Sequence, residues 1–450
     1  MDIGGIGMSG LALILQAFGH QVSGCDKNVF PKILELQARG IAVAHGHSSE
    51  HITADIDALV LSTGVSYLEP EVQEAQKVGK KVMRRIELLA DLMQQKRGIA
   101  VAGTHGKTST SAMVATVFEG CGSDPTAAVG GEVAAIGGNA KVGLGQHFIA
   151  EIDESDPLFA NVRSDIAIIT NIEDDHVALS AEDVRNNYHA SLADLHAAFR
   201  QFAINAKRVV YCADWHSLEQ LLNLENAISY GIERGQYRAS NLRLEGGKPF
   251  FTLTLNGVAL VDVHLLVPGA HNVLNAVATL AVAHLEGLDL QQAVVALAGF
   301  RGAGRRWEVL GEYRQALLVD DYAHNPTKVS AAIAGALSYG KHLRVIFQPH
   351  RVIRTARDWQ RYAEVLQHAH EVLMLDIYSA GETHIEGINS QRILEKMQAD
   401  GFKNVTYFSN LADVKNHVLQ TAKTGDLIVS MGAGDVTRVL REVLLEGGKV

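Results

Sequence analysis

The strongest constraint on this chain is the segment 98–110, which reads Gly-Ile-Ala-Val-Ala-Gly-Thr-His-Gly-Lys-Thr-Ser-Thr. Its apolar run predicts a buried strand, a glycine turn follows, and a helical stretch is expected over 109–121. This is the layout of a phosphate-binding loop. N–H groups at a helix start face the phosphates, the lysine reaches the β- and γ-phosphates, and the threonine hydroxyl binds Mg²⁺. The segment favours ATP or GTP chemistry over the alternative, an ordinary strand–turn–helix unit.

Val101 stands where the full motif has its first glycine, so the match covers the core 103–108. The residues expected to bind the nucleotide phosphates are Gly103, Thr104, His105, Gly106, Lys107, Thr108 and Ser109. Lys107 is the candidate catalytic residue among them, because it can neutralise charge on the transferred phosphate.

Length and charge limit the remaining possibilities. A chain of 450 residues is too long for one core, and about three domains are expected. The net charge of −10 and the lack of a Lys/Arg cluster argue against a nucleic-acid partner. Three widely spaced cysteines give neither a disulfide framework nor a zinc motif, which suits a reducing cytoplasm. Apolar runs are too short for a membrane span and the start does not read as a signal peptide, so no membrane partner is expected.

Short Val/Ile/Leu runs alternate with amphipathic stretches, which predicts an α/β fold with largely parallel sheets. We expect a Rossmann-like domain over 1–93, a central domain with a phosphate-loop ATPase-type parallel sheet over 94–302, and a Rossmann-like domain over 303–450. A helix is expected near 86–93 and a polar connection over 94–98. Strands of the last domain are expected at 316–319, 343–347, 371–375 and 427–429.

A second glycine motif lies at the N-terminus. Residues 5–10 read Gly-Ile-Gly-Met-Ser-Gly, a helical stretch over 11–18 follows, and Asp26 comes after strand-like residues 21–23. This resembles a dinucleotide-binding fingerprint whose turn suits a diphosphate, although the strand before the glycines is almost absent. A glycine turn kept for packing is the alternative. The candidate diphosphate-site residues are Gly5, Gly7, Met8, Ser9, Gly10 and Asp26.

Acidic residues follow two further apolar runs. Glu151 opens the string 151–156 after the run 147–150, and His176 ends the string 170–176. A carboxylate at a strand end facing a phosphate loop can hold Mg²⁺, so Thr108 and Glu151 are expected to share one metal ion. His176 is a candidate ligand of a second metal. Taken singly, such residues are usually solvated loop residues.

Several motifs in one order point to a known family. They are residues 5–10, 103–108, 151–156, 170–176, 268–276, 304–308, 320–327, 347–354 and 430–435. Together they resemble the Mur ligases, the ATP-dependent amino-acid ligases of peptidoglycan precursor synthesis, over essentially the whole chain. The resemblance implies binding of a UDP-sugar by the first domain, ATP by the second and an amino acid by the third.

The resemblance also assigns roles in the last two domains. Asn272 and Asn275 would contact adenine, Arg306 the ATP phosphates and Asp321 the ribose. Arg351 would clamp a substrate carboxylate as a catalytic residue, with Arg354 sharing that task or forming a surface ion pair. His324 is a candidate for substrate contact, and His176 is implied as a catalytic metal ligand. The cofactors implied are ATP and Mg²⁺, with Mn²⁺ as an alternative metal.

The reaction implied is ligation of L-alanine to the lactyl carboxylate of UDP-N-acetylmuramate through an acyl phosphate, by a monomer or weak homodimer. Attachment of a preformed tripeptide to the same nucleotide sugar, in cell-wall recycling, is the alternative within the family. Outside it, an oxidoreductase would leave the phosphate loop unexplained, and a nucleotide switch would leave the N-terminal turn unexplained.

Overall fold

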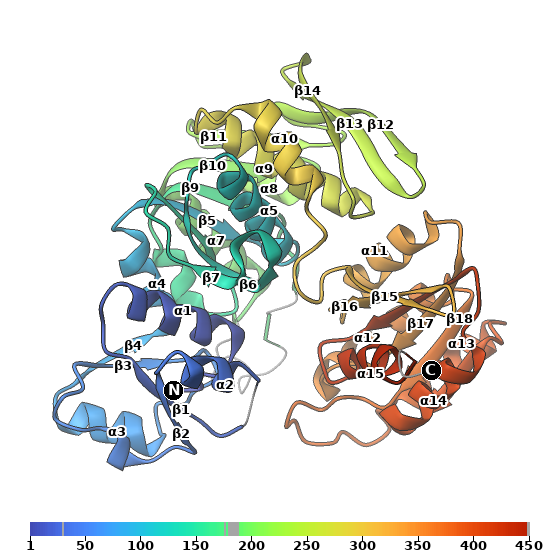
Figure 1. The fold of residues 1–450 in the computed structure, drawn as a ribbon, viewed down its shortest axis with the longest axis horizontal. Coiled ribbons are helices and arrows are strands. Elements are labelled where there is room, and N and C mark those ends of the chain that lie inside the picture. The colour runs from blue at the N-terminus through green and yellow to red at the C-terminus, as the bar shows by residue number, and fades with distance from the viewer. Residues whose placement is uncertain (29–30, 175–176, 179–188, 448–450) are drawn as a thin grey trace. The chain divides into compact units, whose positions relative to one another are not determined.

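The computed structural model describes residues 1–28, 31–174, 177–178 and 189–447. These fall into two compact units, one of residues 1–240, 252–262 and 274–297, the other of residues 241–251, 263–273 and 298–450. Helices and strands alternate along both, and most strand pairs are parallel (Figure 1). The α/β prediction is confirmed.

The first unit begins with two small parallel sheets. Their strands are β1 (Ser23–Asp26) with β2 (Ala42–His45), and β3 (Ala58–Leu61) with β4 (Lys81–Arg84). The accompanying helices are α1 (Ile6–Ala17), α2 (Pro31–Ala38), η1 (Ser49–His51), α3 (Pro70–Lys77) and α4 (Arg85–Met93). Residues 1–3 form no strand, although the Ile3 N–H donates to the Cys25 carbonyl at 3.1 Å. The expected strand at 21–23 was wrong by two residues, because pairing with β2 starts at Ser23.

A ten-stranded sheet follows, in the order β14-β13-β12-β11-β10-β9-β5-β8-β6-β7. Its strands are β5 (Arg97–Ala102), β6 (Thr126–Val133), β7 (Gly138–Lys141), β8 (His147–Glu151), β9 (Ser164–Ile169), β10 (Ala206–Cys212), β11 (Ala227–Gly231), β12 (Tyr237–Glu245), β13 (Lys248–Leu255) and β14 (Val258–His264). The helices of this region are α5 (Lys107–Gly120), η2 (Ala134–Ile136), η3 (Pro157–Asn161), α7 (Leu192–Ile204), α8 (His216–Leu221), α9 (Ala270–Leu285) and α10 (Leu290–Ala298).

Strand β5 sets the position of the phosphate loop. It pairs in parallel with β8 on one side and β9 on the other, and its residues 99–102 are fully buried. A continuous apolar run is typical of such a central strand. Because parallel strands end at one edge, the segments that follow β5, β8 and β9 meet there. The polar connection expected over 94–98 is shorter, since Arg97 and Gly98 pair with β8.

The second unit contains a six-stranded sheet of order β15-β16-β20-β17-β18-β19. Its strands are β15 (Glu308–Tyr313), β16 (Ala316–Asp321), β17 (His342–Phe347), β18 (Glu371–Leu375), β19 (Val405–Phe408) and β20 (Asp426–Met431). Its helices are α11 (Pro326–Leu337), α12 (Val352–Leu366), α13 (Ser390–Ala399), α14 (Leu411–Thr421) and α15 (Thr437–Gly447). Only β15 runs antiparallel to its neighbour. All four strands expected from the sequence are present.

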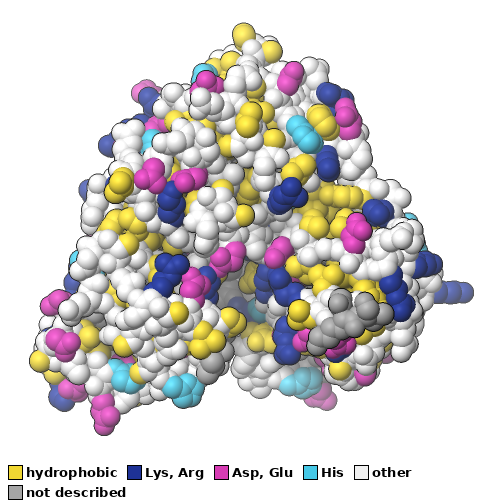
Figure 2. Space-filling view, viewed as in Figure 1, with side chains coloured by type: hydrophobic (Ala, Val, Ile, Leu, Met, Phe, Trp, Pro, Cys, Tyr) yellow, Lys and Arg dark blue, Asp and Glu magenta, His cyan; other side chains and the backbone are white. Residues whose placement is uncertain are grey.

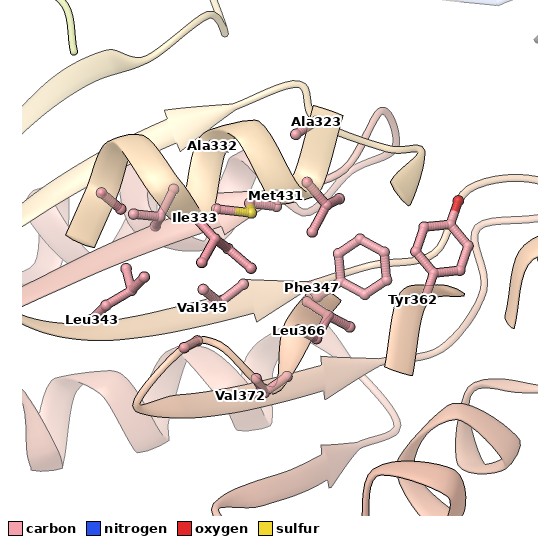
Figure 3. Close-up of a cluster of buried hydrophobic side chains, with 14 of the residues drawn as sticks. Ala323, Ala332, Ile333, Leu343, Val345, Phe347, Tyr362, Leu366, Val372 and Met431 are labelled. Carbon is pink, nitrogen blue, oxygen red and sulfur yellow. The ribbon is translucent and has the colours of Figure 1, made fainter. Parts of the chain in front are cut away.

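One hydrophobic core of this sheet lies between its strands and α11 and α12 (Figure 3), and a second lies between its strands and α14 and α15. Val345 and Phe347 of β17 and Met431 of β20 are fully buried in the first core. Tyr362 of α12 joins them through its ring, and its hydroxyl donates to the His324 carbonyl at 2.7 Å. The first core thereby fixes the loop after β16, where predicted site residues lie.

The surface carries charges of both signs. Figure 2 shows Lys/Arg and Asp/Glu side chains interspersed among hydrophobic ones on the face in view. Among the helices of the described residues, none combines the length and the apolar character needed to cross a bilayer.

Candidate active site

The phosphate loop is built as the motif predicts, between β5 and α5. Gly106 precedes α5 with φ +82° and Gly103 has φ +138°, backbone values that favour glycine. A Cβ at Gly103 would lie 2.0 Å from Thr170 Oγ1, so this position also demands a close approach. No side chain caps α5, which leaves the N–H groups of its first turn available to an anion. The helix begins at Lys107, two residues earlier than expected.

Lys107 occupies a strongly acidic setting. Its Nζ lies 2.6 Å from the carboxylate of Glu154, which is fully buried, and donates to the Gly103 carbonyl at 2.6 Å. Burial alone lowers the pKa of Lys107, but Glu154, Asp153 and Glu151 outweigh it and raise the pKa above its usual value. The lysine is therefore charged at neutral pH and points back over the loop.

Thr108 and Glu151 meet at the same edge. The Thr108 hydroxyl donates to Glu151 Oε1 at 3.0 Å, and the Gly130 N–H from β6 donates to Oε2 at 2.7 Å. Ser111 Oγ lies 3.4 Å from Oε2. A hydroxyl beside a carboxylate is a hard oxygen donor set of the kind that Mg²⁺ prefers. The residues present fit that ion.

The segment after β9 lies along the loop. Asn171 accepts the His105 N–H at 2.8 Å, and His105 Nε2 lies 2.8 Å from Glu173. The Glu173 N–H donates to Thr104 Oγ1 at 2.8 Å. The predicted convergence of this segment with the phosphate loop is thus observed up to residue 174. His176 lies outside the described residues.

Helix α9 brings a further predicted residue to the loop. Thr110 Oγ1 donates to Asn275 Oδ1 at 3.1 Å, and a Cβ at Gly106 would lie 2.9 Å from that oxygen. Asn272, one turn earlier, donates to the Pro268 carbonyl at 2.7 Å. Both side chains are buried at the start of α9.

The N-terminal glycines form a turn that leads into α1 at Ile6, earlier than the expected 11–18. Gly5 is exposed and precedes the helix without a side-chain cap, so its first N–H groups can meet an anion. Gly7 lies against Arg85, whose guanidinium would be 2.7 Å from a Cβ there. Met8, Ser9 and Gly10 are buried inside the helix.

Asp26 braces this turn. Its two carboxylate oxygens accept the Gly4 N–H at 2.9 Å and the Asn28 N–H at 2.8 Å, and the residue is 1% exposed. The Asp26 carboxylate therefore binds backbone N–H groups of this chain. The polar groups that the glycine turn offers to a ligand are backbone N–H groups.

The second unit collects its predicted residues at the edge where β16, β20 and β17 end. Asp321 accepts the Trp307 and Ala323 N–H groups at 2.9 and 2.8 Å. Desolvation raises the pKa of Asp321, while the neighbouring Arg306 and these N–H groups oppose the rise. The guanidinium of Arg306 lies 4.2 Å from the Tyr322 ring centre.

A group of cations surrounds His350 at the same edge. Arg354 Nη1 lies 3.5 Å from His350 Nδ1, and the His324 ring lies 5.9 Å from the His350 ring. Burial, then Arg354, Arg351 and Arg305, lower the pKa of His350 to about 4, so its imidazole is neutral at pH 7. The positive charge here resides on arginine side chains.

Arg351 is held in a special geometry. Its φ of +72° is unusual for arginine, and its N–H donates to the Tyr378 carbonyl at 2.8 Å. Its Nε donates to Glu382 Oε1 at 2.5 Å, and Glu382 Oε2 accepts the Ile353 N–H at 3.1 Å. A carboxylate thus already lies on the arginine that was predicted to clamp one.

Sequence reasoning gave no role to four of these residues: Glu154, Arg85, Arg305 and Glu382. The acidic string 151–156 and the Arg84-Arg85 pair at the start of α4 were the available signals. Neither reveals which charge faces a site, because that depends on loop conformation.

Comparisons with known proteins agree with this arrangement. Three family profiles match in order: "Mur ligase family, catalytic domain" at residues 1–97, "Mur ligase middle domain" at 101–283, and "Mur ligase, glutamate ligase domain" at 305–434. A UDP-N-acetylmuramate–L-alanine ligase of Deinococcus radiodurans is 44% identical, covering 99% of this chain and 92% of the relative. The chain belongs to the Mur ligase family. The resemblance and the three-domain α/β fold expected from the motifs are confirmed.

Other relatives of this Mur ligase point the same way. The enzyme of the same name from Carboxydothermus hydrogenoformans is 42% identical, covering 97% of this chain and 94% of that one. The crystal structure of a UDP-N-acetylmuramate–alanine ligase from Thermotoga maritima matches with a TM-score of 0.86 at 27% identity, covering 100% and 98%. The structure of a murein peptide ligase from Psychrobacter arcticus matches with a TM-score of 0.70 at 23% identity, covering 100% of this chain and 98% of that one. This match shows a likeness of fold alone.

Proposed function

We propose that this chain uses ATP to ligate L-alanine to the lactyl carboxylate of UDP-N-acetylmuramate, a step of peptidoglycan precursor synthesis. The observation that carries the proposal is the full-length identity of 44% to a UDP-N-acetylmuramate–L-alanine ligase. The phosphate loop with Lys107 and the separate glycine turn at α1 supply the two anion sites that such a reaction needs.

The chemistry follows from the substrates. A carboxylate is a poor electrophile, so ATP first phosphorylates it to an acyl phosphate, which the amine then attacks with release of phosphate. Phosphoryl transfer depends on positioning and charge neutralisation. Lys107 would move from Glu154 onto the β- and γ-phosphates, while residues 103–109 would cradle them with backbone N–H groups.

Thr108 and Glu151 would hold Mg²⁺, with Mn²⁺ as an alternative, and the bound cation would neutralise phosphate charge. His176 stays our proposed ligand for a second cation. Asn272 and Asn275 would contact adenine, while Arg306 and Asp321 would contact the ATP phosphates and ribose. These roles rest on the family motifs that the residues occupy.

For the sugar nucleotide, we assign the diphosphate to Gly5, Gly7 and the first turn of α1, with Arg85 as an added cation. Met8, Ser9, Gly10 and Asp26 would shape that turn from behind. Arg351 and Arg354 would hold a substrate carboxylate, with His324 beside them. The resulting division is residues 1–93 for UDP-sugar, 94–302 for ATP and 303–450 for the amino acid.

Because the substrates are ATP and a nucleotide sugar, we place the reaction in the cytoplasm. We also expect the protein to be a monomer or weak homodimer. The test is phosphate release with Mg-ATP and UDP-N-acetylmuramate, adding L-alanine, L-Ala-γ-D-Glu-meso-diaminopimelate or no amine. Release with L-alanine alone supports the proposal. Release with the tripeptide alone assigns the chain to recycling, and equal release without amine contradicts ligation.

A further inference from the structure

A cluster of metal-binding side chains lies in the N-terminal part of the first unit, apart from Thr108 and Glu151. Cys25, His47 and Glu71 each offer one ligand atom, and these atoms all lie within 4.8 Å of one another. Cys25 is in β1, His47 follows β2, and Glu71 is in the first turn of α3. Their distance in sequence explains why cysteine spacing gave no metal motif.

The cluster is closed to solvent. Cys25 is 4% exposed and Glu71 1% exposed, and the His47 side chain is 4% exposed. The Cys25 thiol donates to Glu71 Oε2 at 3.3 Å, and the other oxygen of Glu71 pairs with Nδ1 of His51. A buried carboxylate thus has a thiol on one side and an imidazole on the other.

His47 supplies the second observation. Its Nδ1 lies 3.3 Å from Glu69 Oε2, whereas its Nε2 makes no hydrogen bond with the described part of the chain, although Asp2 Oδ1 is 3.2 Å away. A buried imidazole nitrogen without a hydrogen bond is uncommon. A metal-bound histidine commonly has its other ring nitrogen beside a carboxylate, as Nδ1 of His47 lies beside Glu69.

We propose that Cys25, His47 and Glu71 bind a divalent transition metal of the zinc class. Sulfur, nitrogen and carboxylate oxygen together form a donor set of zinc rather than of magnesium. Ligands about 2.0–2.3 Å from a tetrahedral zinc lie roughly 3.3–3.8 Å apart, which small side-chain adjustments reach from the observed spacing.

The charges of such a site balance. Metal binding releases the thiol proton to solvent, so a thiolate and a carboxylate neutralise the divalent ion, and His47 contributes a ring nitrogen. Three protein ligands leave the fourth position of this metal site to water. The site would join β1, the segment after β2 and α3.

The test is a titration of the chelator-treated full chain with Co²⁺, followed by Zn²⁺, without nucleotide. The wild type should bind Co²⁺ with a thiolate-to-cobalt charge-transfer band that Zn²⁺ abolishes. The oxygen ligands Thr108 and Glu151 cannot produce that band. Cys25→Ser should remove it, while the matched control Cys212→Ser, which changes another buried cysteine, should keep it.

Two further readouts separate a metal site from mere packing. Zn²⁺ should raise the melting temperature of the wild type and of Cys212→Ser but not of Cys25→Ser. Glu69→Gln, which removes the carboxylate beside His47, should weaken Co²⁺ binding roughly 10- to 100-fold. Absence of the charge-transfer band in the wild type overturns the proposal whether or not a variant folds, and so does a band that survives in Cys25→Ser.

Discussion

Replacing Gly130 with alanine should displace the Glu151 carboxylate with little effect on the stability of the fold. Gly130 lies in β6, and its φ is not positive, so alanine fits its backbone. The new Cβ would lie 2.5 Å from Glu151 Oε2 and 2.6 Å from Oε1. Ordinary contact begins at 3.4 Å, so the carboxylate has to retreat by about 0.9 Å.

The expected cost falls on activity. The carboxylate is the end of a flexible side chain, so we expect at most ~1 kcal/mol of lost stability. A misplacement near 1 Å at a catalytic site can reduce turnover by about 10²-fold, or ~2.7 kcal/mol of transition-state stabilisation. Gly130→Ala should therefore fold normally but release phosphate about 10²-fold more slowly and need more Mg²⁺.

Phosphate release at varied Mg²⁺ is the assay, with thermal melting alongside. Gly138→Ala, in neighbouring β7, is the control, because the nearest atom to its Cβ would be 3.7 Å away. Wild-type turnover and Mg²⁺ dependence in Gly130→Ala would refute the placement of the metal at Glu151.

Three other changes test separate parts of the molecule. Lys107→Ala should lower phosphate release by roughly 10³-fold or more while circular dichroism shows a retained fold, because it removes the cation for the transferred phosphate. Arg351→Ala should leave ATP affinity unchanged by calorimetry but weaken use of the carboxylate substrate by ~2 kcal/mol or more, and a fall in ATP affinity would contradict its role. Burial raises the pKa of Glu286, but hydrogen bonds from Arg97 and His147 outweigh that effect and lower the pKa from 4.5 to about 2. A carboxylate whose pKa is lower in the folded than in the unfolded chain stabilises the fold at pH values above its unfolded pKa. The free energy of unfolding should therefore fall by about 3 kcal/mol as pH drops from about 5 to 2. Glu286→Gln should flatten that pH dependence in denaturant titrations.

The meeting of the phosphate loop with the segments after β8 and β9 was predictable from sequence. Each follows an apolar run, and parallel strands end at one edge whatever their side chains. Helix starts were less predictable, since apolar periodicity marks only the packed part of a helix. Thus α1 begins at Ile6, and Gly7 and Gly10 lie within it.

Hydrogen-bond and ion-pair partners that depend on loop conformation were not predictable from the sequence pattern. The place of Glu151 at the end of its strand predicted that it meets Thr108, but nothing in the string 151–156 indicated that Glu154 meets Lys107. Asp26 was expected to face a ligand, yet the backbone of residues 4 and 28 occupies its oxygens. Such pairings depend on three-dimensional packing that spacing alone does not encode.

The central claim, that ATP activates the carboxylate of UDP-N-acetylmuramate, has a direct test. UDP-N-acetylmuramate labelled with heavy oxygen in its lactyl carboxylate is turned over with ATP and L-alanine, and the released phosphate is analysed by mass spectrometry. An acyl phosphate requires that one carboxylate oxygen leave with the phosphate, so the account predicts one heavy oxygen in each phosphate released. Phosphate free of label, with the displaced heavy oxygen recovered in water instead, would contradict it.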